Sequence, residues 1–129
     1  MTASSIILYV IVALLILFYA KRFIQRIHMN EYSASEVAEK LLDTSIVLLD
    51  VRTSKERNQS AIPGSLHIPL GNIPEKLKIL EKHKQKEIIC YCRSGSRSLK
   101  AASILQKNGF QAANMKGGMM EWSSLKLKS

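Results

Sequence analysis

Residues 87–105 read EIICYCRSGSRSLKAASIL, and this stretch decides the fold. The apolar, β-prone run at residues 87–91 predicts a strand that is covered on both faces. A short polar loop at residues 93–96 follows and opens a helix, which carries apolar residues at helical spacing and has a left-handed stop at Gly109. A buried strand that leads through a Gly-containing loop into a helix is the repeating unit of α/β proteins.

Strands and helices alternate on both sides of this unit. The apolar run at residues 46–49 predicts a second covered strand, which runs into Asp50. A Ser-x-x-Glu capping pattern at residues 33–36 begins a helix that should end near Asp43. A polar stretch at residues 53–60 follows. The other predicted elements are a short strand at 66–69, a helix capped by Asn72 with Glu75, a strand at 110–115 and an amphipathic turn from residue 119. This alternation predicts an α/β fold with a mostly parallel central sheet and helices on both faces.

Cys92 stands at the carboxyl end of its predicted strand, the edge at which parallel α/β sheets bind ligands. The loop N–H groups and the positive end of the following helix should stabilise the Cys92 thiolate, and Arg93 and Arg97 add two cations. We therefore expect an acidic, nucleophilic thiol in a cradle that also holds an anion. Cys90 lies on the same side of the strand within the apolar run, so core filling is favoured over a redox pair with Cys92.

The N-terminal segment predicts a membrane anchor. Residues 1–20 contain no charged side chain, and at ~1.5 Å per residue they reach roughly 30 Å, the thickness of a hydrocarbon core. Lys21, Arg22 and Arg26 follow this run instead of preceding it, which is unlike a cleaved signal peptide. Basic residues stay on the cytoplasmic side, so residues 1–28 should form a single-pass anchor and residues 29–129 a cytoplasmic domain, at the inner membrane of a bacterial host.

The composition limits the rest of the sequence to one small domain. The protein has 129 residues, a net charge of +9 and two cysteines two positions apart, which excludes a multidomain protein and a disulfide-built scaffold. The lysines of residues 76–86 are interleaved with glutamates and lack alternating aromatics, so we expect a solvated, membrane-facing or substrate-attracting surface and no nucleic-acid partner. The three histidines lack ligand spacing, and neither a metal nor another cofactor is predicted.

Four motifs in the right order resemble the single-domain rhodanese-like sulfurtransferases, over about residues 31–123. They are Asp50-Val51-Arg52, the turn Ile62-Pro63-Gly64-Ser65, the loop Cys92-Arg93-Ser94-Gly95-Ser96-Arg97-Ser98, and Gly117-Gly118 with Glu121-Trp122. The resemblance implies the rhodanese-like three-layer fold and places Cys92 at the family's active-site cysteine. Ser60-Ala61 and Arg57 depart from the family pattern, and these changes bear on substrate preference because they lie outside the loop.

The resemblance also implies that sulfur moves in two steps. The Cys92 thiolate attacks the outer sulfur of a donor such as thiosulfate and becomes a persulfide, and a thiol or cyanide acceptor then removes that sulfur. Arg97 is expected to hold either the loop or the charge of the donor, and Asp50 with Arg52 should support the loop as a salt-linked pair. The expected substrate-binding residues are Arg93, Ser94, Gly95, Ser96, Arg97 and Ser98.

Two other functions fit the same sequence less well. A cysteine phosphatase needs a C-x5-R loop whose arginine forks onto a phosphate, whereas the spacing from Cys92 to Arg97 is one residue shorter, C-x4-R. A membrane-tethered binding module without catalysis could use the same fold and its basic surface. The intact Cys92 favours the enzyme, because a scaffold has no need of that thiol.

Overall fold

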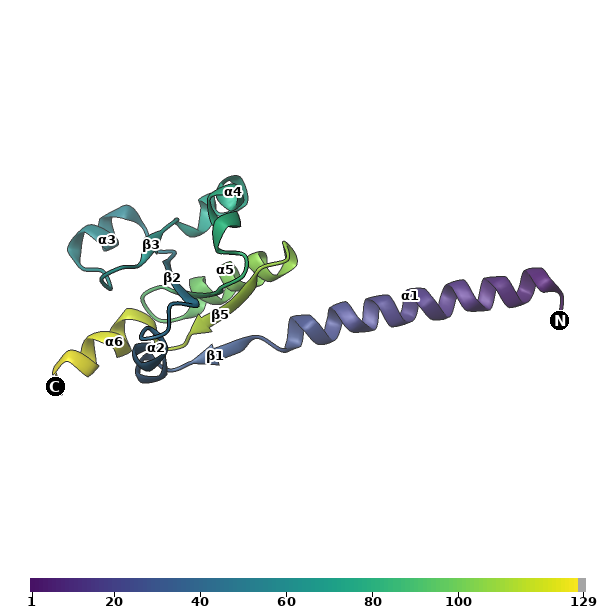
Figure 1. Cartoon of the computed structure of the whole chain (residues 1–129), viewed down its shortest axis with the longest axis horizontal. Coiled ribbons are helices and arrows are strands. Elements are labelled where there is room, and N and C mark those ends of the chain that lie inside the picture. The colour runs from purple at the N-terminus through teal and green to yellow at the C-terminus, as the bar shows by residue number, and fades with distance from the viewer. Residues whose placement is uncertain (128–129) are drawn as a thin grey trace.

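The computed structural model describes residues 1–127, which form a long N-terminal helix and an α/β domain (Figure 1). A five-stranded sheet in the order β1-β5-β4-β2-β3 runs through the domain, and every neighbouring pair of strands is parallel. The strands are β1 (Asn30–Tyr32), β2 (Ile46–Asp50), β3 (Leu66–His67), β4 (Glu87–Tyr91) and β5 (Gln111–Met115). The predicted α/β architecture with a parallel central sheet is confirmed.

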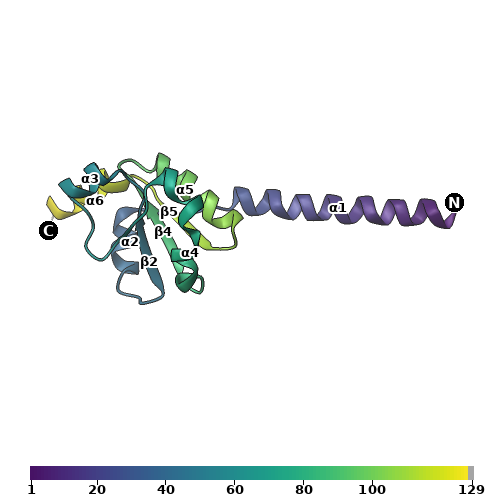
Figure 2. The same ribbon diagram turned by 90° about the horizontal axis from the view of Figure 1, so that it is seen from above.

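Helices cover both faces of the sheet, as the turned view shows (Figure 2). On one face the core includes Cys90, Cys92 and Leu105, and on the other it includes Tyr91 and Met115. This arrangement follows from the alternation of side chains along buried parallel strands, which are apolar on both sides. The helices of the domain are α2 (Ala34–Lys40), α3 (Ser54–Gln59), α4 (Leu77–Leu80), α5 (Ser96–Lys107) and α6 (Gly118–Leu127).

Three local predictions differ from the structure. Residues 53–60, a polar stretch for which no element was predicted, contain helix α3, because Thr53 and Glu56 form a reciprocal capping box at its start. The helix expected after Asn72 is instead a broken series of short turns around α4, and Asn72 makes no cap hydrogen bond there. Pro74 lacks an N–H group, so a regular helix cannot be hydrogen-bonded through this segment. Strand β1 was not predicted, because its three residues carry no apolar alternation.

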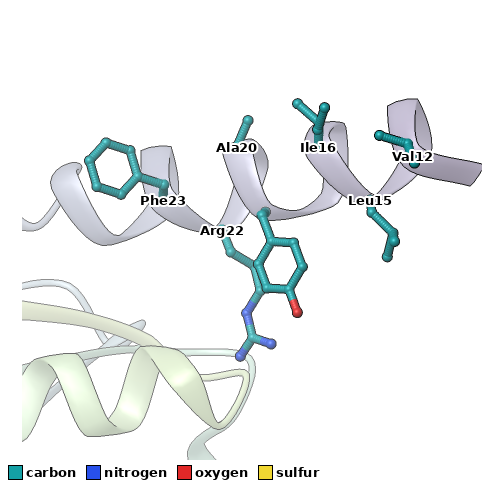
Figure 3. A pocket seen from close by; sticks show the side chains of 7 residues that line it. Val12, Leu15, Ile16, Ala20, Arg22 and Phe23 are labelled. Carbon is teal, nitrogen blue, oxygen red and sulfur yellow. The ribbon is translucent and has the colours of Figure 1, made fainter. Parts of the chain in front are cut away.

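Helix α1 (Ala3–Ile27) extends from the domain as one continuous rod (Figure 1). Residues Ala3–Ile24 are long and apolar enough to cross a membrane, and none of these residues is buried inside the protein. Figure 3 shows Val12, Leu15, Ile16 and Phe23 projecting from this helix, with Arg22 near its domain end. A helix that exposes apolar side chains on every side has no favourable environment in water.

Candidate active site

The loop between β4 and α5 holds Cys92 in a ring of hydrogen-bond donors. Gly95 caps α5 with a positive φ of 106°, and a Cβ there would lie 3.3 Å from the Gly117 nitrogen, so the turn favours glycine. This turn directs the Gly95 N–H group to Cys92 Sγ at 3.1 Å, and the Ser98 hydroxyl lies 3.4 Å from the same sulfur. The sulfur is buried at the base of the loop.

Hydrogen bonds make Cys92 more acidic than an ordinary thiol. Burial works to raise the pKa of Cys92, but donation from Ser98 and from the Gly95 and Ser94 backbone outweighs it and holds the pKa below its ordinary value. Ser98 also lies 2.5 Å from Asn114 Oδ1. Because Ser98 carries a single hydroxyl proton, it donates to the sulfur or to Asn114 at any one time.

Arg97 ties the loop to helix α3. Its two terminal nitrogens donate to the Glu56 carboxylate at 2.7 and 2.8 Å, in a bidentate pair that is about one third exposed. This pair, with a smaller contribution from Thr53, lowers the pKa of Glu56 to about 2. We expected Arg97 to hold either the loop or the charge of the donor. The geometry fits the first role, because the guanidinium is already paired with the Glu56 carboxylate.

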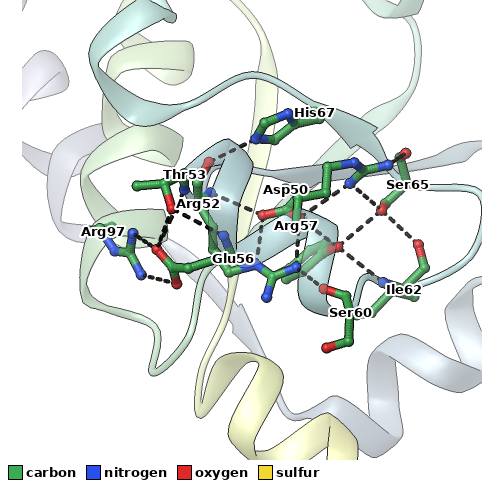
Figure 4. A network of polar contacts seen from close by, with 11 residues as sticks. Asp50, Arg52, Thr53, Glu56, Arg57, Ser60, Ile62, Ser65, His67 and Arg97 are labelled. Carbon is green, nitrogen blue, oxygen red and sulfur yellow. Dashed lines mark hydrogen bonds and ion pairs between the residues drawn. The ribbon is translucent and has the colours of Figure 1, made fainter.

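Asp50, the last residue of β2, is a buried carboxylate within a network of polar contacts (Figure 4). Arg52 donates to both of its oxygens at 2.9 and 2.8 Å, Arg57 lies 3.2 Å away, and the Tyr91 hydroxyl donates at 3.1 Å. Burial alone would raise the pKa of Asp50, but the Arg52 hydrogen bonds keep it below its ordinary value. Tyr91 directly precedes Cys92, so this network fixes the end of β4 from which the loop departs.

Helix α6 closes over the loop. The N–H groups of Met119 and Met120 donate to the carbonyls of Cys92 and Arg93 at 2.8 and 3.1 Å. This approach requires glycine at position 118, because a Cβ there would lie 2.5 Å from the Cys92 carbonyl oxygen. A cleft of about 370 Å³ lies beside the loop and is lined by Arg52, Glu56, Gln59, Ser60, Arg93, Met119, Met120 and Ser123.

Comparison with known proteins agrees with this geometry. The family model of the rhodanese-like domain matches residues 33–125. The chain belongs to the rhodanese-like family. "Putative sulfurtransferase YtwF" of Bacillus subtilis is 40% identical over 95 residues, which cover 73% of this chain and 90% of that protein. A "Sulfurtransferase" of Allochromatium vinosum is 36% identical over 97 residues, which cover 74% and 89% of the two proteins.

A solved structure shows the same rhodanese-like fold. The crystal structure of a rhodanese-like domain protein from Staphylococcus aureus superposes with a TM-score of 0.68 at 34% identity, over 73% of this chain and 91% of that one. Relatives at this level of identity support rhodanese-type sulfur transfer as the activity of the protein.

The rhodanese-like loop brings three of the expected site residues to the Cys92 sulfur, namely Gly95, Ser98 and the backbone of Ser94. Arg93, Ser94 and Ser96 are exposed, and Arg97 is paired with Glu56. Asp50 and Arg52 form a salt-linked pair at the end of β2, and their support of the loop stays a prediction. Within residues 1–127, no three His, Cys, Asp or Glu side chains converge as a metal site would require.

Two residues that contribute to the site, Glu56 and Asn114, were not predicted from the sequence. Glu56 had a readable signal, since Thr53-x-x-Glu56 matches the capping box and predicts the helix that presents this carboxylate to Arg97. Asn114 could not be recognised from the sequence. A single Asn in a short apolar strand shows no pattern that predicts a hydrogen bond with Ser98, which is distant in the sequence. Only the pairing of β4 with β5 brings Asn114 beside the loop.

Proposed function

We propose that this protein is a membrane-anchored sulfurtransferase that carries sulfur as a persulfide on Cys92. The observation that carries the proposal is the buried Cys92 sulfur, which accepts hydrogen bonds from Gly95 and Ser98 and has a lowered pKa. These donors stabilise a thiolate before the reaction and a persulfide anion after it, without a base to activate water.

Thiosulfate is the donor that we propose for the first step. The Cys92 thiolate attacks the outer sulfur, a new S–S bond forms at Cys92, and the S–S bond of thiosulfate breaks so that sulfite leaves with the electron pair. Arg93 is exposed beside the loop, where its cation can attract the dianion. In the second step a thiolate or cyanide attacks the outer persulfide sulfur and regenerates the Cys92 thiolate.

The proposed anchor is helix α1. Residues Ala3–Ile24 meet the length and hydropathy that a membrane span requires. Lys21 and Arg22, followed by Arg26, place positive charge at the domain end of the helix, which favours a cytoplasmic domain. The cytoplasm also keeps Cys92 reduced, as persulfide turnover requires.

Intact-mass analysis of the full-length protein in detergent micelles tests the proposal. Thiosulfate should add the mass of one sulfur, and dithiothreitol should remove it. Cys92→Ser should abolish the adduct, and the matched variant Cys90→Ser should retain it. An adduct that survives Cys92→Ser, or no adduct on the wild type, would contradict the assignment of the nucleophile and favour a non-catalytic module.

A further inference from the structure

The polarity of the sheet fixes which end of the domain lies nearest to the anchor. β1 follows α1 directly and leads away from it, and all five strands are parallel. The amino ends of the strands therefore face α1, and the carboxyl ends face the opposite way. Both views of the molecule show α3 and α6, which flank the loop of Cys92, on the side remote from α1 (Figures 1 and 2).

The connection between the span and the sheet is short. The candidate span ends at Ile24 and β1 begins at Asn30, so only residues 25–29 separate them. Even a fully extended segment of this length reaches at most roughly 17 Å. The amino edge of the sheet is thus held close to the surface of the bilayer. Consistent with this, Ile24 and His28 line a common groove with Gly109 and Phe110, which precede β5.

The amino edge carries lysine charge at the surface. Lys82, Lys84 and Lys86 precede β4, and Lys107 ends the helix that leads to β5. The two glutamates beside them already have partners, because Glu81 lies 3.6 Å from Lys84 and the Tyr32 hydroxyl donates to Glu87. At this edge and at the domain end of α1, cations outnumber carboxylates. The cations are Lys21, Arg22, Arg26, Lys82, Lys84, Lys86 and Lys107, and the carboxylates are Asp43, Glu81 and Glu87.

The geometry points to an upright domain whose lysine edge, formed by Lys82, Lys86 and Lys107 beside the Glu81–Lys84 pair, binds anionic lipid headgroups while Cys92 faces away from the bilayer. This inference rests on the proposed function, because it requires α1 to span the membrane. Lysines near an anionic leaflet are attracted to it, and the attraction acts only within a Debye length of about 10 Å.

The same arrangement suits an anionic sulfur donor. β4 begins at the lysine edge with Glu87 and leads to Cys92, and five strand residues at about 3.3 Å each place the sulfur roughly 17 Å farther from the lipid. This separation exceeds the Debye length, so the negative surface does not repel thiosulfate from the loop. We therefore expect the sulfur donor and the acceptor to be water-soluble molecules and not lipids.

Lysine acetylation of the full-length protein in lipid nanodiscs tests the orientation. With a neutral succinimidyl acetate reagent, we expect Lys82, Lys86 and Lys107 to react about fivefold more slowly in phosphatidylglycerol discs than in phosphatidylcholine discs. A fivefold factor corresponds to about 1 kcal/mol per lysine, and 1 M salt should abolish it. Lys55 and Lys116 lie at the carboxyl edge and should react equally in both lipids. Equal slowing of these two lysines, or no slowing at the lysine edge, would overturn the inference.

A charge-reversal pair and a second reagent sharpen the test. In the double variant Lys82→Glu with Lys86→Glu, Lys107 should no longer be acetylated more slowly in phosphatidylglycerol discs. In the matched variant Lys55→Glu with Lys116→Glu, the slower acetylation of Lys107 should remain. Anionic iodoacetate and neutral iodoacetamide should alkylate Cys92 in the same ratio in both lipids, and a lower iodoacetate rate in phosphatidylglycerol would contradict the orientation.

The outcomes also separate this inference from the proposed function. A protein that fails to remain in the discs would overturn the anchor and the orientation together. Loss of sulfur transfer with an intact lysine footprint would overturn the activity alone.

Discussion

Removal of one charge from the pair between Arg97 and Glu56 should weaken the attachment of α3 to the start of α5, next to the Cys92 loop. In Glu56→Gln the carboxylate becomes a neutral amide of the same shape, and Arg97 loses its counter-charge. The pKa of Glu56 falls from 4.5 to about 2 in the folded protein, which would correspond to roughly 3 kcal/mol if the pair were shielded from water. The side chains are 34% and 29% exposed, so solvent screening reduces the expected loss to about 1 kcal/mol.

The pH dependence of this loss follows from the direction of the shift. A carboxyl group with a depressed folded-state pKa contributes its stability fully above its unfolded value of about 4.5, and that stability disappears as the pH falls towards 2. Thermal unfolding of the full-length protein, followed by circular dichroism, should show a midpoint about 5 °C lower for Glu56→Gln at pH 7. The difference from the wild type should shrink below pH 4.5.

The exposed pair between Glu81 and Lys84 provides the matched control. These side chains are 56% and 40% exposed at 3.6 Å, so Glu81→Gln should change stability by a few tenths of a kcal/mol at most. An equal loss for both variants, or a loss in Glu56→Gln that persists at pH 2, would refute the idea that this ion pair holds α3.

Three further changes test the rest of the site. Ser98→Ala removes a donor to the Cys92 sulfur, so the pKa of Cys92 should rise and the pH profile of iodoacetamide alkylation should move to higher pH; an unmoved profile would mean that the backbone N–H groups suffice. Gly118→Ala should displace the loop and cut sulfur transfer at least tenfold, because the new Cβ would meet the Cys92 carbonyl oxygen, whereas Gly71→Ala, which has open space, should retain activity. Asp50→Asn should cost about 3–5 kcal/mol, since it leaves two arginines beside a buried neutral group, and a melting midpoint within a few degrees of the wild type would argue against the network.

The sequence predicted the position of the Cys92 loop between a strand and a helix, and the main strands of the sheet, because both depend on local signals. The apolar runs at residues 46–49 and 87–91 correspond to β2 and β4, since strands buried on both faces must be continuously apolar. The position of Cys92 followed from its place after such a run. These features depend on a few neighbouring residues, so they can be predicted from one sequence alone.

The parts that escaped prediction depend on long-range pairing or on short elements. β1 exists because it pairs with β5, more than 80 positions later in the sequence, and its three residues show no pattern by themselves. The partner of Arg97 is 41 positions away at Glu56, and no spacing rule joins them. Pro74, by contrast, was visible in the sequence, and its missing N–H group explains why the segment before α4 is broken.

The placement of Cys90 has a consequence for how long a stored sulfur survives. A neighbouring thiolate could attack the inner sulfur of a persulfide on Cys92, close a disulfide and release hydrosulfide. Cys90 is fully buried in apolar surroundings, and this burial raises its pKa, so it remains protonated and does not attack. The two cysteines also stand two residues apart in extended backbone, about 7 Å between Cα atoms, which is too far for an unstrained bridge. We therefore expect that Cys90 does not remove the sulfur bound to Cys92, so that each sulfur atom leaves only by reaction with an external acceptor.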